Sequence, residues 1–217
     1  MRYNIEGDSL PVLKVSLEAG EQIQCEGGAM SWMDEGIEMQ TSAGGMGKAL
    51  GRVFTGETAF INTYVANQSG EIAFSSKFPG SIRAIEITPG NGVIIQKGAY
   101  LASVGNLTNE VHLQKRLGTG IFGGEGFLMR KISGTGMVFL EIDGSAHDYD
   151  IPAEACKIIS TGHLAVMSES CSMEIRSVKG IKNKLLGGEG FFNTVVKGPG
   201  RIILQSMPFF RLMYQTH

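Results

Sequence analysis

Three glutamates in glycine-rich turns are the residues whose type and spacing best suit chemistry. These turns contain Gly56 and Glu57; Gly123, Gly124, Glu125 and Gly126; and Gly187, Gly188, Glu189 and Gly190. The glutamates stand 68 and 64 residues apart, so their carboxylates occupy equivalent places in a recurring pattern. Three equivalent carboxylates near a common axis could hold a cation or a cationic ligand.

A structural role for the same glutamates is the alternative that we favour. Each carboxylate would accept hydrogen bonds from the N–H groups of its own turn, or pair with a basic residue that precedes it. The preceding basic residues are Lys48, Arg52, Lys115, Arg116, Lys182 and Lys184. Because carboxylates that leave water are usually paired, we expect no metal ion and no cofactor.

The glycine and lysine segments also invite a phosphate-binding interpretation, since backbone N–H groups beside a lysine can cradle an anion. No G-x-x-x-x-G-K-[ST] pattern occurs. Residues 118–123 match G-x-G-x-x-G, but they lead into an expected strand where a dinucleotide site needs a helix. Turn glycines explain these segments better than a phosphate site.

Other reactive side chains do not form a recognisable catalytic set. His147, Asp148, Tyr149 and Asp150 form the one local cluster of histidine and carboxylates, and no further ligands stand at usable spacing. Ser168, Ser170 and Cys171 lie close together without a G-x-S-x-G pattern. The sequence therefore predicts a protein that is not an enzyme.

Composition limits the remaining classes. The net charge of −2 argues against a broad electrostatic hold on nucleic acid or anionic lipid. Three cysteines without a C-x-x-C pair suit free thiols in a reducing compartment. The first residues lack the apolar core of a signal peptide, and no apolar run approaches the roughly 18 residues that span a bilayer. We therefore expect a cytoplasmic protein.

An internal repeat must position the glutamate turns. The first anchor of this repeat is a glycine, which occurs as Gly28, Gly98 and Gly162. Each of these glycines stands eleven residues after the end of a strand-like piece, at Leu17, Ile87 and Ile151 respectively, and each precedes a glutamate turn. Because the anchor glycine and the glutamate turn recur three times in the same order, the sequence predicts three repeats within one compact unit, at 8–77, 78–143 and 144–217. Glycine makes up 31 of 217 residues, twice the usual share of roughly 7%, as many turns require.

Each repeat reads as a set of short strands. Alternating apolar residues at 12–17 and 85–87 predict opening strands, and further strand-like pieces surround the anchor glycines. Closing hairpins are expected to turn at 134–136 and 198–200. Short helical turns are expected at 46–54, 112–117 and 181–186. The predicted fold is all-β, with three tandem β-sandwich-like repeats in a pseudo-threefold arrangement.

At these motifs the chain resembles the bacterial proteins that share the mitochondrial-biogenesis (altered inheritance of mitochondria) domain. The matching segments are 28–30, 44–45 with 56–57, 123–127 and 187–191, and the resemblance covers essentially the whole chain. It implies a fold similar to that of the trp RNA-binding attenuation protein, with three small β-sandwich units per chain and ring-like trimers. It implies no reaction, and the attenuation protein's tryptophan- and RNA-binding residues have no counterpart motif here.

Together these observations predict a non-enzymatic oligomeric scaffold or binding module. The alternative is a ring-forming binder of a small ligand or nucleic acid, and an enzyme that uses the repeated glutamates is less favoured. The expected partners are further copies of the chain in a trimer and an unknown protein or small ligand, and nucleic acid and membrane are the less favoured partners. Phe209 and Phe210, in an aromatic and methionine-rich tail, are the candidate interface residues.

Overall fold

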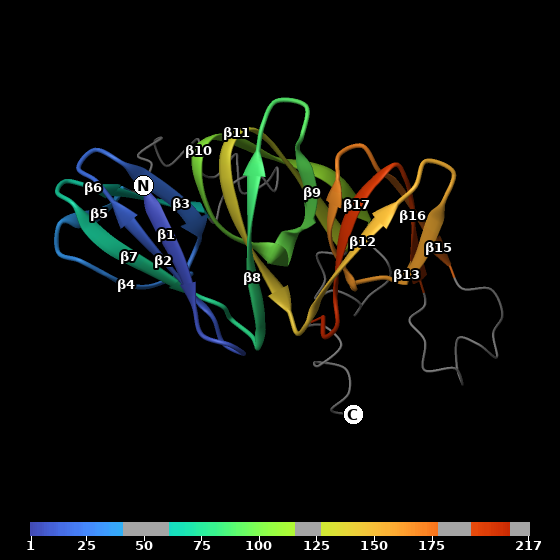
Figure 1. Cartoon of the computed structure of the whole chain (residues 1–217), viewed down its shortest axis with the longest axis horizontal. Coiled ribbons are helices and arrows are strands. Elements are labelled where there is room, and N and C mark those ends of the chain that lie inside the picture. Colours follow the sequence, from blue (N-terminus) through green and yellow to red (C-terminus); the bar gives the residue numbers. More distant parts are fainter. Residues whose placement is uncertain (41–60, 116–126, 178–191, 209–217) are drawn as a thin grey trace.

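A computed structural model describes residues 1–40, 61–115, 127–177 and 192–208, and most of these residues lie in antiparallel β-strands (Figure 1). The all-β prediction is confirmed. The strands are β1 (Arg2–Glu6), β2 (Val12–Leu17), β3 (Gln22–Glu26), β4 (Met30–Met33), β5 (Ile37–Gln40), β6 (Ile61–Ala66), β7 (Gly70–Ser75), β8 (Gly80–Ile87), β9 (Val93–Gln96), β10 (Tyr100–Lys115), β11 (Phe127–Asp143), β12 (Ala146–Ile151), β13 (Cys156–Ser160), β14 (Leu164–Ser168), β15 (Ser172–Ser177), β16 (Phe192–Lys197) and β17 (Gly200–Gln205).

The strands form three groups that lie in a row along the molecule (Figure 1). The first group contains β2 to β7, with β1 added at its edge beside β2, the second β8 to β11, and the third β12 to β17. In the first group β7 pairs with β2 and β4, while β6 pairs with β3 and β5. In the third group β17 pairs with β12 and β14, while β16 pairs with β13 and β15.

The second group shows the same pairing with longer strands. The C-terminal half of β11 pairs with β8 and the start of β10, and its N-terminal half pairs with β9 and the rest of β10. The order of strand pairing therefore recurs in the three groups, while the three predicted repeats and their pseudo-threefold arrangement stay predictions.

The predicted closing hairpins are wrong. Residues 134–136 lie inside the continuous strand β11, and the two halves of β11 pair with different strands. In the third group β16 and β17 belong to different sheets. The glycines serve close approach within the ladder: a Cβ on Gly134 would stand 2.2 Å from the Asn106 carbonyl oxygen, and one on Gly105 would stand 2.6 Å from that of Thr135.

The predicted helical turn at 112–117 is also wrong over its described part. β10 runs on to Lys115 because its ladder with β11 continues to the pair Lys115–Phe127. A short 3₁₀ turn, η1 (Lys97–Ala99), lies instead at the second anchor glycine. The other two expected helical turns, at 46–54 and 181–186, lie outside the described residues.

Three hydrophobic clusters follow the three groups and are linked by shared strands. β2 shows the simplest pattern, with Leu13, Val15 and Leu17 buried and the residues between them partly exposed. The first two clusters also take residues from the following group: Leu101 and Ala102 of β10 join the first cluster. Residues 165 and 166 of β14 join the second. Neighbouring groups therefore complete one another's cores.

Candidate functional sites: an open cleft and two free sheet edges

The sequence-predicted glutamate turns lie outside the described residues, at 41–60, 116–126 and 178–191. The candidate interface residues Phe209 and Phe210 also lie outside them. Their proposed roles stay predictions. The sites described below come from the folded strands.

The cluster at 147–150 lies on β12 and forms ion pairs rather than a metal site. Asp148 accepts a hydrogen bond from Arg201 Nη2 at 2.9 Å and pairs with Arg83 Nη2 at 3.5 Å. The ammonium of Lys157 stands 4.1 Å from the centre of the Tyr149 ring. Within the four described ranges, no group of three or more His, Cys, Asp and Glu side chains is arranged to hold a metal ion.

The serine and cysteine at 168 and 171 serve the fold. The Ser168 hydroxyl donates to the Arg201 carbonyl oxygen at 3.2 Å and accepts the Arg201 N–H at 3.0 Å, so it ties β14 to β17. Cys171 is buried, and burial raises the pKa of its thiol. A thiol with a raised pKa is a poor nucleophile near neutral pH.

A buried carboxylate, Glu141, connects the first two strand groups. It is 3% exposed on β11 and accepts the backbone N–H of Lys77 at 2.9 Å. The Lys77 ammonium lies 3.4 Å from Glu141 Oε1 and also contacts Glu26 of β3. Burial raises the pKa of Glu141 above its ordinary value, although the Lys77 N–H and charge oppose that shift.

Lys77 holds its own proton firmly in this arrangement. Burial alone would lower the pKa of Lys77, but its interactions with Glu26 and Glu141 raise the pKa above the ordinary lysine value. Because all three groups have partners that hold them in place, the cluster serves as a connection between β3, β11 and the segment before β8.

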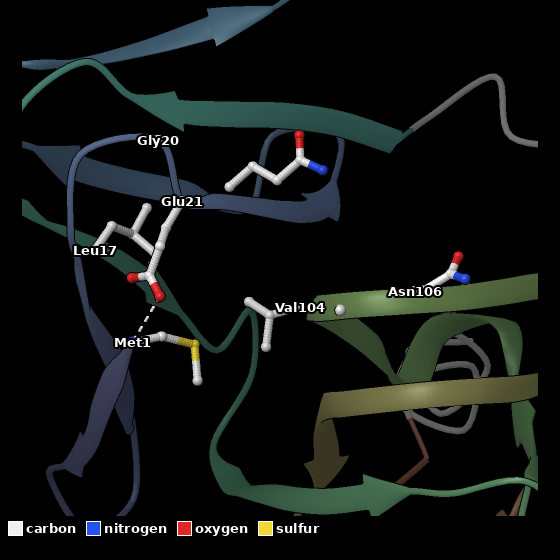
Figure 2. A pocket seen from close by; sticks show the side chains of 8 residues that line it. Met1, Leu17, Gly20, Glu21, Val104 and Asn106 are labelled. Carbon is white, nitrogen blue, oxygen red and sulfur yellow. Dashed lines mark hydrogen bonds and ion pairs between the residues drawn. The ribbon is translucent and has the colours of Figure 1, made fainter.

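An open cleft of about 540 Å³ lies where the turn between β2 and β3 faces β10 (Figure 2). Its lining residues are Met1, Leu17, Gly20, Glu21, Gln22, Val104, Gly105 and Asn106. The N-terminal ammonium pairs with Glu21 Oε1 at 2.7 Å, and this interaction lowers the pKa of the Glu21 carboxyl. The cleft thus places a charged pair beside the apolar side chains of Leu17 and Val104.

The strand groups are joined by two junctions with the same geometry. β10 of the second group pairs antiparallel with β3 of the first, and β14 of the third pairs antiparallel with β9 of the second. In both cases the third strand of one group meets the second strand of the group before it. The resulting ten-stranded sheet runs through all three groups.

The two strands that would continue this series are edges. β4 occupies the junction position in the first group and β13 occupies it in the third, yet each ends its sheet among the described strands. Side chains on these edges are large, apolar and exposed: Trp32 is 47% exposed, Met33 37% and Ile158 64%. Unpaired strands of this kind are templates for pairing with another chain.

Sequence reasoning missed these edges, although one signal was available. The pattern Ser31-Trp32-Met33 and the pair Ile158-Ile159 place large apolar side chains on both faces of short strands. Strands of this kind need cover on both faces. The repeat offsets also align Trp32 with Ala102 and Val166, which are both buried.

Comparison with known proteins agrees with this architecture. The sequence model of the family described as mitochondrial biogenesis AIM24 matches residues 3–207, so the chain belongs to that family. The X-ray crystal structure of a Streptococcus pyogenes protein is similar over 99% of this chain and 97% of that chain, with a TM-score of 0.81 and 24% identity. That likeness shows the fold alone. No curated protein matches the chain.

Proposed function

We propose that the chain is a non-enzymatic building block that assembles with further copies of itself into a trimer and acts as a scaffold. The observation that carries this proposal is the pair of free edges, β4 and β13, at the two junction positions that no strand of the described ranges fills. Both edges expose large apolar side chains, and such edges favour pairing with another chain.

The three-group architecture gives the proposal its physical basis. Small β-units bury too little apolar surface to be stable alone, and inside this chain the first and second cores are each completed by residues of the next group. Self-association would pair the free edges of the first and third groups in the way that the groups already pair inside the chain.

Native mass spectrometry on the full chain at micromolar concentration tests this function. We expect the mass of three chains, with a smaller species on dilution. A single-chain mass throughout the accessible concentration range would overturn the proposal.

The cleft between the β2–β3 turn and β10 favours a second candidate function, the binding of a small amphipathic ligand. Its charged pair and apolar wall suit a molecule with one polar end. Ligand-observed NMR with a library of small acids and amines tests this candidate. Asn106→Trp places a large side chain at the cleft rim, and Glu110→Trp, further along β10, is the control. Loss of binding in Asn106→Trp alone would support this candidate, while equal binding to both variants would exclude the cleft.

A further inference from the structure

The two internal junctions share one register. Ala102 stands opposite Cys25 at the first junction, and Val166 stands opposite Ile95 at the second. The next pair follows in the same way, with Ser103 opposite Gln24. At the second junction Met167 stands opposite Ile94. One rule therefore relates the third strand of a group to the second strand of the group before it.

Independent features of the strands identify the corresponding residues at the free ends. The ladder of β4 with β7 is interrupted between Met30 and Trp32, and that of β10 with β11 is interrupted between Tyr100 and Ala102. The ladder of β14 with β17 shows the same interruption just before Val166. Trp32 therefore occupies the place of Ala102 and Val166.

The partner position on β13 follows from the spacing of the second strands. Cys25 stands eight residues after Leu17, and Ile95 stands eight residues after Ile87. The residue eight positions after Ile151 is Ile159. Like Cys25 and Ile95, Ile159 is buried and lies on a strand whose other side is already paired.

We propose that β4 of one copy pairs antiparallel with β13 of a second copy, with Trp32 opposite Ile159 and Met33 opposite Ile158. This inference rests on the proposed self-association and names its interface. The partner is another copy of the chain because the two edges are the complementary halves of a junction already built twice within it.

Exposure supports this pairing. At the second junction, the residues that correspond to Trp32, Met33 and Ile158 are buried. They are Val166, Met167 and Ile94 respectively. Trp32, Met33 and Ile158 are exposed large hydrophobic side chains in the single chain. Pairing the edges would bring Met33 and Ile158 together on one face, because directly opposite residues of an antiparallel ladder point the same way.

The cores and charges agree with the same register. The first and second clusters each receive two residues from the third strand of the following group. The third cluster receives none from a following group within the described part of the chain, and Trp32 of the neighbouring copy would cover its edge. The next pair in the register, Asp34 with Lys157, joins opposite charges.

The contact joins two different surfaces, so it repeats from copy to copy. Such a heterologous contact closes into a ring when the rotation per copy allows it and otherwise extends as a filament. The proposed trimer corresponds to closure after three copies.

Disulfide trapping in the full chain tests the register. In a Cys156→Ser background, one preparation carries Met33→Cys and the other Ile158→Cys, while Cys25 and Cys171 stay buried and unreactive. Directly opposite residues of an antiparallel ladder have Cα atoms about 4.5–5.5 Å apart, within the range of a disulfide. We expect a cross-linked dimer when the two preparations are mixed and oxidised, and none from either alone.

The matched control replaces Ile158→Cys with Lys157→Cys, which moves the thiol to the opposite face of the same strand. We expect the Met33–Ile158 pair to cross-link on the order of tenfold faster than this control. Equal rates, or no cross-link in a sample that native mass spectrometry shows to be oligomeric, would overturn the interface and leave self-association standing. A sample that stays monomeric would overturn both.

A variant with both Met33→Cys and Ile158→Cys in one chain separates ring from filament. A covalent ladder that stops at three chains supports the closed trimer. A ladder without limit supports the β4–β13 pairing and contradicts closure.

Discussion

Replacing Ile158 with alanine tests the energetic role of the β13 edge. Ile158 is 64% exposed in the single chain, so most of its side chain is free to be buried by a second copy. Full burial of an isoleucine contributes about 1.5–3 kcal/mol, and the exposed part therefore contributes about 1–2 kcal/mol per interface. At about 1.4 kcal/mol per tenfold change, Ile158→Ala should weaken each interface by roughly 5- to 30-fold. A closed trimer contains three such interfaces, and the loss recurs at each.

Leu10→Ala is the matched control, because Leu10 is 59% exposed and lies in the turn between β1 and β2. Both substitutions remove three carbons from an aliphatic side chain of similar exposure. Sedimentation velocity over a concentration series measures association, and thermal unfolding measures monomer stability. We expect a shift in association for Ile158→Ala only, with similar unfolding of both variants. Equal association of the two variants would refute the assignment of β13 as an interface.

Three further outcomes follow from the described side chains. Because burial raises the folded pKa of Glu141 above 4.5, its contribution to stability is fully present below that pH and is lost as pH rises through the folded pKa. Urea titrations at several pH values measure the free energy of unfolding of the wild type and of Glu141→Gln. The wild-type value minus the variant value should fall as pH rises through this window, and a difference that does not change with pH would contradict the buried environment of Glu141. Gly105→Ala should cost about 3 kcal/mol, since Gly105 has φ +98° and its Cβ would meet a carbonyl oxygen at 2.6 Å. Gly20→Ala, with φ +88° and no atom within 4 Å of the added Cβ, should cost only about 1 kcal/mol, and equal losses in chemical denaturation would exclude the close approach of β10 and β11.

Local pattern was enough to predict the fold class and several strands. The alternation of β2 places Leu13, Val15 and Leu17 on one face, and the structure buries all three. The same reasoning wrongly predicted a turn at residues 134–136, because a Gly-Thr-Gly sequence suits a tight turn and the close approach of two paired strands equally well. Only the partner strand decides between them, and that partner, around Gly105, is far away in the sequence.

The candidate interface was beyond local pattern for the same reason. The apolar side chains of β4 and β13 indicate strands that need cover, but whether a strand is an edge depends on which distant strands pair with it. Their role became visible once the register of Ala102 with Cys25 and of Val166 with Ile95 was known. Glu141 offered a clearer hint, as a single charge within the apolar run 138–142. The glutamate turns stay predictions.

The emission of Trp32 tests the central claim, self-association through the free edges, most directly. Trp32 is the one tryptophan among the 217 residues, and it lies on the β4 edge with 47% of its surface exposed in the single chain. The account predicts short-wavelength emission, shielded from iodide, in the concentrated protein. On dilution the emission should move to longer wavelength in parallel with the loss of oligomer mass. An oligomer in which Trp32 stays as accessible to iodide as in the diluted chain would contradict it.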